Sequence, residues 1–216
     1  MADDETIAAH DDTAAGSDGA HVPGTGDPLA GDPRSMWKRL RAGDFYRAEG
    51  EELKVHHLAG MALQEEFNAT GAHEGARRAE LLSRLLGTRG KGVQIRPPLF
   101  VDYGAHLHIG DGTFVNYGLV ALDVADIRIG RDCQLAPGVQ LLTAWHPLEP
   151  GLRRAGWEAA TPITIGDNVW LGAGVIVLPG VTIGDNTVVG AGALVTRDLP
   201  SDVVAVGSPA RVVRSL

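Results

Sequence analysis

Residues 165–200 read IGDNVW LGAGVI VLPGVT IGDNTV VGAGAL VTRDLP, six consecutive hexamers without a break. Each hexamer begins with an aliphatic residue and carries Val, Thr, Ala or Leu at its fifth position. Apolar spacings of four and then two residues do not fit an amphipathic helix, whose apolar positions recur every three or four residues. The fourth position holds the residue types that best tolerate a left-handed backbone, so the chain turns a corner every six residues. These fourth positions are Asn168, Gly174, Gly180, Asn186, Gly192 and Asp198.

Short strands that each end at a corner stack as a parallel β-solenoid, in which every coil buries its aliphatic row against the neighbouring coils. A coil with three faces needs 18 residues, and the sequence Ile-Gly-Asp-Asn at 165–168 indeed returns at 183–186. The same motif opens at Ile109 and again at Ile129. The sequence therefore predicts an all-β solenoid domain.

Two interruptions break this register. Counting 18 residues from Ile109 leads to position 127, yet the motif restarts at Ile129, so two extra residues lie near 122–126. After Leu141 the pattern stops and resumes only at Ile165, which leaves 18 surplus residues centred on 143–162. Irregular loops on a regular scaffold commonly carry the chemistry of a protein.

The chain divides by composition into three parts: residues 1–33, 34–90 and 91–216. The chain has 27 acidic and 19 basic residues, and eight of the acids lie in 1–33, a stretch without Lys or Arg. We expect this acidic stretch to be a disordered tail. Residues 34–90 predict helices over 36–41, capped by Ser35, over 51–68, and over 76–86, stopped by Gly87. The third of these predicted helices would cover an end or edge of the solenoid domain, 91–216, with a row of leucines: Leu81, Leu82, Leu85 and Leu86.

Composition also limits location and partners. Cys133 is the single cysteine, so no internal disulfide forms, and its inward position predicts a buried residue rather than a nucleophile. No run of 18 apolar residues exists, and the N-terminus lacks the features of a signal peptide. We therefore expect a cytoplasmic protein that does not bind membranes. The sequence predicts no basic surface, so we also expect no binding of nucleic acid.

Several motifs together resemble the sugar O-acetyltransferases, which include the maltose, galactoside and nodulation-factor acetyltransferases. The resemblance covers residues 35–216, nearly everything outside the acidic tail. It implies a left-handed parallel β-helix, a homotrimer, and acetyl-coenzyme A as the acetyl donor. The matching motifs are RAGDFY at 41–46, DYG at 102–104, FVNY at 114–117, LDV at 122–124, LAPGV at 135–139, TAWHP at 143–147, NVWLG at 168–172 and GSPAR at 207–211.

His146 is the predicted general base. Deprotonating a hydroxyl as it attacks a thioester needs a base whose pKa is near the working pH, which imidazole provides. His146 lies where the large loop leaves the solenoid, and Pro147 stiffens the backbone beside it. The family's His-Pro motif assigns the same role.

The resemblance also implies the remaining parts of an acyl-transfer site. The backbone N–H of Ala173 corresponds to the oxyanion donor, and Asn116, Asp123 and Asp102 correspond to acceptor-binding residues. Asp123 falls within the two-residue break, which supports its role independently. Asn116 equally fits a corner-forming residue, and Asp102 equally fits a surface turn.

Coenzyme A would lie along a strip of small residues where a ligand can approach the backbone: Gly172, Ala173, Gly190 and Ala191. Family positions near the cofactor are Thr196 and three arginines suited to phosphate, Arg197, Arg211 and Arg214. Each arginine equally fits a solvated surface charge. Trp170 corresponds to a tryptophan beside the cofactor groove, with core or trimer packing as the alternative.

One departure concerns the acceptor. Some relatives carry an acidic acceptor ligand where this chain has Ala48, and Glu49 or Glu51 could replace it only with a shifted backbone. The identity of the acceptor is therefore open. A xenobiotic hydroxyl, such as that of an antibiotic, competes with a sugar because both present hydroxyls to the same base.

Two other classes of function compete with acetyl transfer. A zinc hydratase of the γ-carbonic-anhydrase type shares the solenoid, but it needs three convergent histidines, whereas His106 and His108 lie far along the chain from His146. We therefore expect no metal. A non-catalytic scaffold is the other possibility, and it would have no need of a base in the loop.

Overall fold

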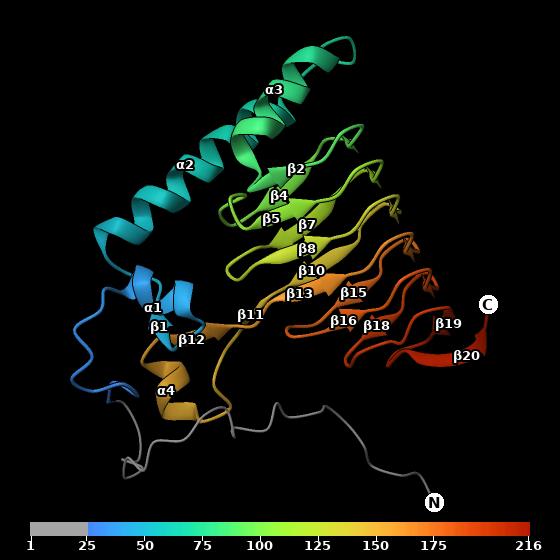
Figure 1. The fold of residues 1–216 in the computed structure, drawn as a ribbon. Helices are drawn as coiled ribbons and strands as arrows, with labels where there is room; N and C mark the ends of the chain where they lie inside the picture. Colours follow the sequence, from blue (N-terminus) through green and yellow to red (C-terminus); the bar gives the residue numbers. More distant parts are fainter. Residues whose placement is uncertain (1–25) are drawn as a thin grey trace, which may run out of the picture.

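The computed structural model describes residues 26–216 and contains, within them, four helices, a small antiparallel sheet and three sheets that form a solenoid (Figure 1). The helices are α1 (Met36–Ala42), α2 (Glu51–Asn68), α3 (Gly75–Leu85) and α4 (Pro150–Arg154). We number the solenoid sheets I to III in the order in which the chain visits them. Sheet I holds β2 (Thr88–Arg89), β5 (Leu107–Ile109), β8 (Ile127–Ile129), β13 (Ile163–Ile165) and β16 (Thr182–Ile183).

Sheet II holds β3 (Gln94–Ile95), β6 (Phe114–Val115), β9 (Gln134–Leu135), β14 (Trp170–Leu171), β17 (Val188–Val189), β19 (Val203–Val206) and β20 (Arg211–Ser215). Sheet III holds β4 (Leu99–Val101), β7 (Leu119–Leu122), β10 (Gln140–Leu142), β15 (Ile176–Val177) and β18 (Leu194–Val195). The small antiparallel sheet joins β1 (Tyr46–Arg47), β12 (Trp157–Ala160) and β11 (Ala144–Trp145). All pairings inside the solenoid sheets are parallel except that of the last strand, β20.

The predicted solenoid is confirmed, and the hexamer rule accounts for its core. Thr164 pairs with Thr182, which is 18 residues later in the chain. The first and fifth positions of every hexamer are buried, from Ile165 and Val169 to Val195 and Leu199. One continuous apolar cluster therefore runs through the coils, as expected when each coil buries its aliphatic row against its neighbours.

The corners follow the prediction with one exception. Asn168, Gly174, Gly180, Asn186 and Gly192 all have positive φ angles. The prediction is wrong for Asp198, the fourth residue of the last hexamer, whose φ angle is not positive. The side chain of Asp198 instead accepts a hydrogen bond from the backbone N–H of Thr182 at 2.7 Å.

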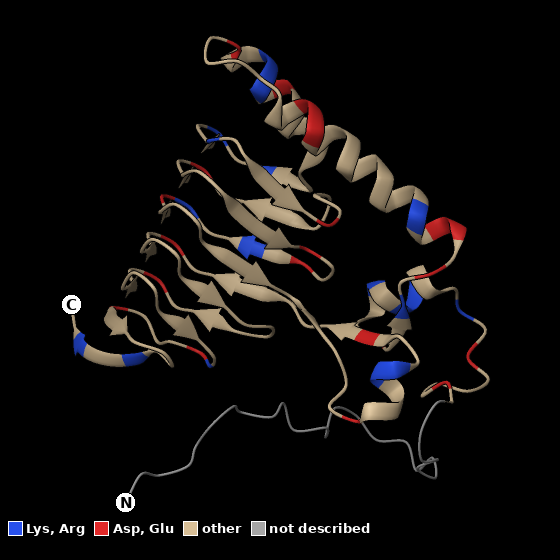
Figure 2. Ribbon diagram, turned by 180° about the vertical axis from the view of Figure 1, so that it is seen from behind, with Lys and Arg blue, Asp and Glu red and all other residues tan. Residues whose placement is uncertain are grey.

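Carboxylates line the corner between sheets I and II, along one edge of the solenoid (Figure 2). Asp111 accepts the backbone N–H of Lys91, and Asp185 accepts that of Asp167, each at 2.7 Å. These side chains satisfy backbone donors of the neighbouring coil, so this acidic edge is part of the scaffold.

Both predicted interruptions are present. Leu107 pairs with Ile127, and Leu99 pairs with Leu119, so the first coils are 20 residues long instead of 18. The two extra residues predicted near 122–126 therefore have a counterpart in the preceding coil. Residues 143–162 leave the solenoid at the corner between sheets III and I and form β11, α4 and β12 beside it (Figure 1).

The helical segment largely matches its prediction. Ser35 caps α1, accepting the N–H of Lys38 at 3.3 Å, and α2 has the predicted bounds. Helix α3 ends at Leu85 with Leu86 as its C-cap, so the stop predicted before Gly87 is correct to within one residue, but Gly87 has no positive φ and is not a left-handed cap. A Cβ at Gly87 would lie 2.2 Å from the carbonyl oxygen of Ala105, so close packing explains this glycine. The leucines of α3 and its end (Leu81, Leu82, Leu85 and Leu86) are buried in the solenoid core, as predicted.

The predicted acidic tail extends into the described part of the chain. Residues 1–25 of it lie outside the described residues, but residues 26–33 are placed. Asp27 and Asp32 lie 2.8 and 3.6 Å from the guanidinium of Arg39, which is 2% exposed. Assigning 26–33 to a disordered tail is therefore wrong, because a buried guanidinium needs these carboxylates. No helix within residues 26–216 is long and apolar enough to span a bilayer; the cytoplasmic location stays a prediction.

Candidate active site

A cavity of about 690 Å³ lies where α2, the corner between sheets III and I, and the 143–162 excursion meet. It brings together two residues that the sequence predicted, His146 and Asp102. Its wall also includes His57 and Lys54 of α2 and Glu158 of β12.

His146 directly follows β11, and its side chain is 59% exposed. The loop behind it is fixed, because Arg153 donates hydrogen bonds to the carbonyl oxygens of Pro147 and Leu148 at 2.8 and 3.0 Å. Trp145 donates to Thr161 at 3.0 Å, which ties the two arms of the excursion together. The imidazole is thus presented to the cavity from a rigid loop.

Glu158 is a site residue that the sequence analysis missed. Its Oε2 lies 4.0 Å from Nε2 of His146, and its side chain is only 15% exposed. Burial raises the pKa of Glu158, while the nearby His146 and a hydrogen bond from Tyr46 act to lower it. Tyr46 pairs with Glu158 across β1 and β12, so the partner depends on strand register, which no motif in the sequence records.

Asp102 is half-buried in the cavity wall, which rejects the alternative of a plain surface turn. Burial raises the pKa of its carboxyl, and the neighbouring His57 lowers it. Among residues 26–216 the carboxylate has no hydrogen-bond or ion-pair partner. A desolvated carboxylate of this kind gains from a ligand that donates hydrogen bonds.

Asp123, predicted to bind the acceptor, lies beneath the cavity rather than in it. It is fully buried, and Oδ1 accepts the backbone N–H groups of Asp102 and Tyr103 at 3.0 and 2.8 Å. Oδ2 accepts that of His106 at 3.1 Å. Desolvation outweighs these bonds and raises the pKa of Asp123 to about 6. The acceptor-binding assignment is corrected: Asp123 holds the loop that carries Asp102.

We expect Asp123→Asn to cost more stability in acid than at neutral pH. Between 3.8, the ordinary pKa, and about 6, the native state holds a proton on Asp123 that the unfolded chain has released. The wild type therefore loses stability relative to the variant as pH rises through this window, by about 1–3 kcal/mol. Urea unfolding of both proteins at pH 4.5 and pH 7.5, at one protein concentration, measures the difference. A pH-independent difference would show that the carboxyl is not perturbed in this way.

Other predicted residues lie at the opposite border of sheet III, at its corner with sheet II. Asn116 and Gly172 occupy equivalent corner positions, donating their N–H groups to Leu135 and Val189 of the following coils. The side chain of Asn116 accepts the N–H of Tyr117 at 2.9 Å, which favours its corner-forming reading.

The strip predicted for coenzyme A continues along this corner. Ala173 and Ala191 are exposed and one coil apart, linked by the N–H of Gly192 donating to the carbonyl of Ala173 at 2.8 Å. A Cβ at Gly172 would lie 2.5 Å from the backbone nitrogen of Ala191, so the stacked coils already require glycine there. The exposed Ala173 and Ala191, together with the backbone beside them, form this strip.

The remaining predicted residues do not line the cavity. Thr196 and Arg197 follow β18, at the corner of sheets III and I, whereas Arg211 and Arg214 are exposed on β20. Trp170 is 55% exposed on sheet II, so its core-packing alternative is wrong.

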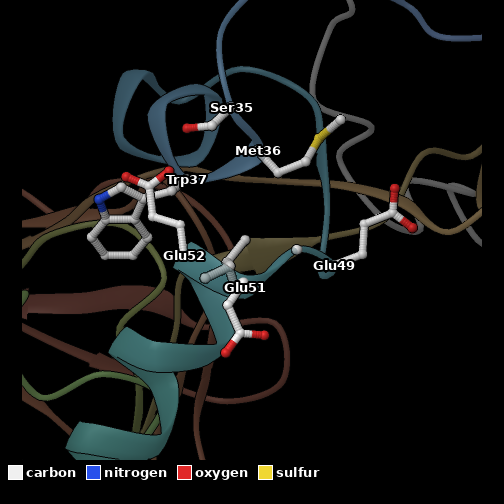
Figure 3. A pocket seen from close by; sticks show the side chains of 8 residues that line it. Ser35, Met36, Trp37, Glu49, Glu51 and Glu52 are labelled. Atoms are coloured by element: carbon white, nitrogen blue, oxygen red, sulfur yellow. The ribbon is translucent and has the colours of Figure 1, made fainter.

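A second hollow, of about 480 Å³, adjoins the cavity across residues 49–53. Figure 3 shows it between α1 and the start of α2, with the carboxylate of Glu52 beside Trp37, while Glu49 and Glu51 extend away from the indole. Glu49 and Glu51, the possible substitutes for the acid missing at Ala48, line both this hollow and the cavity that holds His146. Glu49 forms an exposed ion pair with Arg47 at 2.5 Å.

The histidines required for a zinc hydratase do not converge. Nδ1 of His106 contacts the carbonyl oxygens of Asp123 and Val124 at 2.8 and 3.1 Å, and the ring is buried. His108 lies against Thr88, and neither histidine lines the cavity that holds His146. Within residues 26–216 no three His, Cys, Asp or Glu side chains are grouped to hold a metal ion.

Comparison with known proteins agrees with the solenoid fold and the helical cap described above. Two family models match: the bacterial transferase hexapeptide (six repeats) over residues 162–197, and the maltose acetyltransferase hexapeptide capping motif over 39–90. The galactoside O-acetyltransferase of Escherichia coli is 40% identical over 181 residues, 84% of this chain and 89% of that protein.

Solved structures agree. A maltose O-acetyltransferase from Clostridium difficile superposes with a TM-score of 0.84 at 41% identity, covering 86% of this chain and 99% of that one. A galactoside acetyltransferase in complex with coenzyme A gives a TM-score of 0.82 at 40% identity, covering 84% and 91%. The capped solenoid, its excursion and these likenesses show that this chain belongs to the hexapeptide-repeat acetyltransferases of the maltose and galactoside type.

Proposed function

We propose that this chain transfers an acetyl group from acetyl-coenzyme A to a hydroxyl of a sugar or related small acceptor, with His146 as the general base. The observation that carries this proposal is the cavity in which His146, Glu158 and the unpaired carboxylate of Asp102 meet. The named activities of the relatives and the coenzyme A complex of one similar structure support it.

Acetyl transfer requires two proton transfers, one to His146 and one from it. His146 takes the proton of the acceptor hydroxyl as its oxygen attacks the thioester carbon, and the backbone N–H of Ala173 stabilises the oxyanion. When the tetrahedral intermediate collapses, the carbon–sulfur bond breaks and the imidazolium returns the proton to the leaving sulfur. The products are the acetyl ester and free coenzyme A.

Glu158 positions the base in this scheme. A distance of 4.0 Å to Nε2 of His146 is too long for a hydrogen bond, but catalytic contacts are often loose before substrate binds. A carboxylate that accepts the N–H of one ring nitrogen leaves the lone pair on the other and stabilises the imidazolium.

Glu158→Gln tests this role. We expect kcat to fall about 10- to 100-fold, because the amide keeps the shape but loses the charge that stabilises the imidazolium. The KM for acetyl-coenzyme A should stay unchanged. Glu80→Gln, on the exposed face of α3, is the matched control. An unaltered kcat in Glu158→Gln would exclude Glu158 from the mechanism.

We also propose that the active form is a homotrimer in which neighbouring chains share each site. Within one chain, His146 and Asp102 lie at one border of sheet III, and Ala173 and Ala191 at the other. None of the small-residue strip lines the cavity, which supports a site completed by the strip of a second chain. Three large side chains that an interface could cover are 45–55% exposed on the outer faces: Phe100, Tyr117 and Trp170.

The acceptor is the open part of the proposal. Ala48 lines the cavity and leaves room that a carboxylate would fill, which favours a bulkier xenobiotic hydroxyl as the second candidate. A panel of mono- and disaccharides and hydroxylated antibiotics, each with acetyl-coenzyme A and read by release of free thiol, separates the two. No thiol release above background with any hydroxyl acceptor would contradict the proposed transfer.

A further inference from the structure

His57 occupies a defined orientation in the wall of the proposed acceptor cavity. Its Nδ1 lies 2.9 Å from the backbone carbonyl oxygen of Asp102. A carbonyl oxygen only accepts hydrogen bonds, so Nδ1 carries the hydrogen, and in the neutral form of the ring the lone pair is then on Nε2. The ring also meets Tyr103 edge to face, with centroids 5.8 Å apart at an interplanar angle of 73°.

Nε2 of His57 has no hydrogen-bond partner among residues 26–216. Among the described residues the fully buried nitrogens without a partner all belong to arginines, so Nε2 of His57 is exposed, and the residue lines the cavity. Two hydrogen-bond acceptors without protein donors, one from α2 and one from the solenoid, therefore border the same space.

Nε2 of His57 and the carboxylate of Asp102 together determine which hydrogen-bond donors a ligand needs. An imidazole lone pair and a carboxylate each accept a hydrogen bond, and each is costly to desolvate without a donor. Two neighbouring hydroxyl groups supply one donor to each. A molecule with a single hydroxyl gives its only donor to His146 and leaves both acceptors unpaired.

Resting on the acetyl transfer proposed above, we propose that His57 is a specificity-determining residue that reads a vicinal diol. One hydroxyl of the diol donates to Nε2 of His57 and its neighbour donates to Asp102, while a third hydroxyl of the same acceptor faces His146. The substrate class is thus a polyhydroxylated ring such as a sugar, not an isolated alcohol.

The test combines one substitution with one change in the acceptor. His57→Asn retains an amide N–H that can bond the carbonyl of Asp102 but removes the Nε2 acceptor. For the best sugar in the panel we expect KM to rise about 5- to 15-fold with kcat little changed. Among the monodeoxy analogues of that sugar, one should already bind wild type this much more weakly and lose nothing further in the variant.

Controls separate this role from a structural one. His73→Asn changes an exposed histidine in the turn between α2 and α3 and should leave every acceptor unaffected. His57→Gln, whose amide oxygen can extend toward the position of Nε2, should recover part of the sugar binding. Melting temperature and the KM for acetyl-coenzyme A should be the same in His57→Asn as in wild type.

Equal losses on the sugar and on all of its deoxy analogues would overturn the assignment, since His57 would then act through the packing of α2. An unchanged KM for the sugar, or turnover confined to monohydric alcohols, would overturn it as well. Either result leaves acetyl transfer itself standing, whereas absent thiol release in wild type contradicts the transfer.

Discussion

Replacing His146 by alanine should lower kcat by about two to four orders of magnitude, the range associated with loss of a general base. The side chain is 59% exposed and its loop is held by other residues, so the fold should tolerate the change. Calorimetric binding of coenzyme A and the melting temperature should match wild type. Steady-state thiol release at saturating acetyl-coenzyme A measures the loss.

His73→Ala is the matched control, because it removes an exposed imidazole that does not line the cavity. It should retain full activity. Near-normal turnover in His146→Ala would remove His146 from the mechanism, and the cavity would then need another base. His57 is the other histidine in its wall, so His57→Ala in the same assay identifies whether it has taken that role.

The solenoid could be predicted because its physical rule is local. The residue types within each hexamer indicate which side chains point inward and where the backbone turns, and the same pattern recurs in every coil. Asp198 fails the rule in the last full coil, where its side chain bonds the backbone of Thr182. The position of the excursion was equally predictable, because a broken register is visible in the sequence.

The site was only partly predictable, because its contacts join segments without a shared period. His146 stood out through its place in the excursion and its motif. Glu158 did not, since it reaches His146 only through the pairing of β11, β12 and β1. Asp123 was found at the break, yet position alone could not show that its carboxylate points to backbone N–H groups instead of the cavity. The place of His57 in the cavity wall depends on how α2 packs against the corner of sheets III and I, which no motif in the sequence specifies.

A mixture of two inactive variants should recover activity, which is the largest effect expected from the shared-site proposal. One variant is His146→Ala. The other carries Ala173→Trp and Ala191→Trp, because two indoles on the narrow exposed strip would block the pantetheine arm by volume while sparing the buried aliphatic rows. Each parent alone should be at least about a hundredfold below wild type.

Unfolding the two parents together and refolding them produces mixed trimers. Some interfaces then pair an intact His146 from one chain with an open Ala173 and Ala191 strip from its neighbour, and those sites should turn over at the wild-type rate. Native mass measurement establishes that mixed trimers form, and the recovered activity should follow the statistical fraction of such interfaces. Lys91→Trp, at the exposed corner of sheets I and II, controls for the effect of a surface indole and should stay active by itself.

The result depends on the geometry of a single chain, in which base and strip lie at opposite borders of sheet III. If each chain completed its own site, a mixed trimer would contain only base-dead and donor-dead sites. Activity would then stay at the parental background although the mixed trimers had formed, and the shared site would be wrong. Recovery can arise only when the two halves of one site come from different chains, so the experiment tests the assembly and the catalytic role of both halves together.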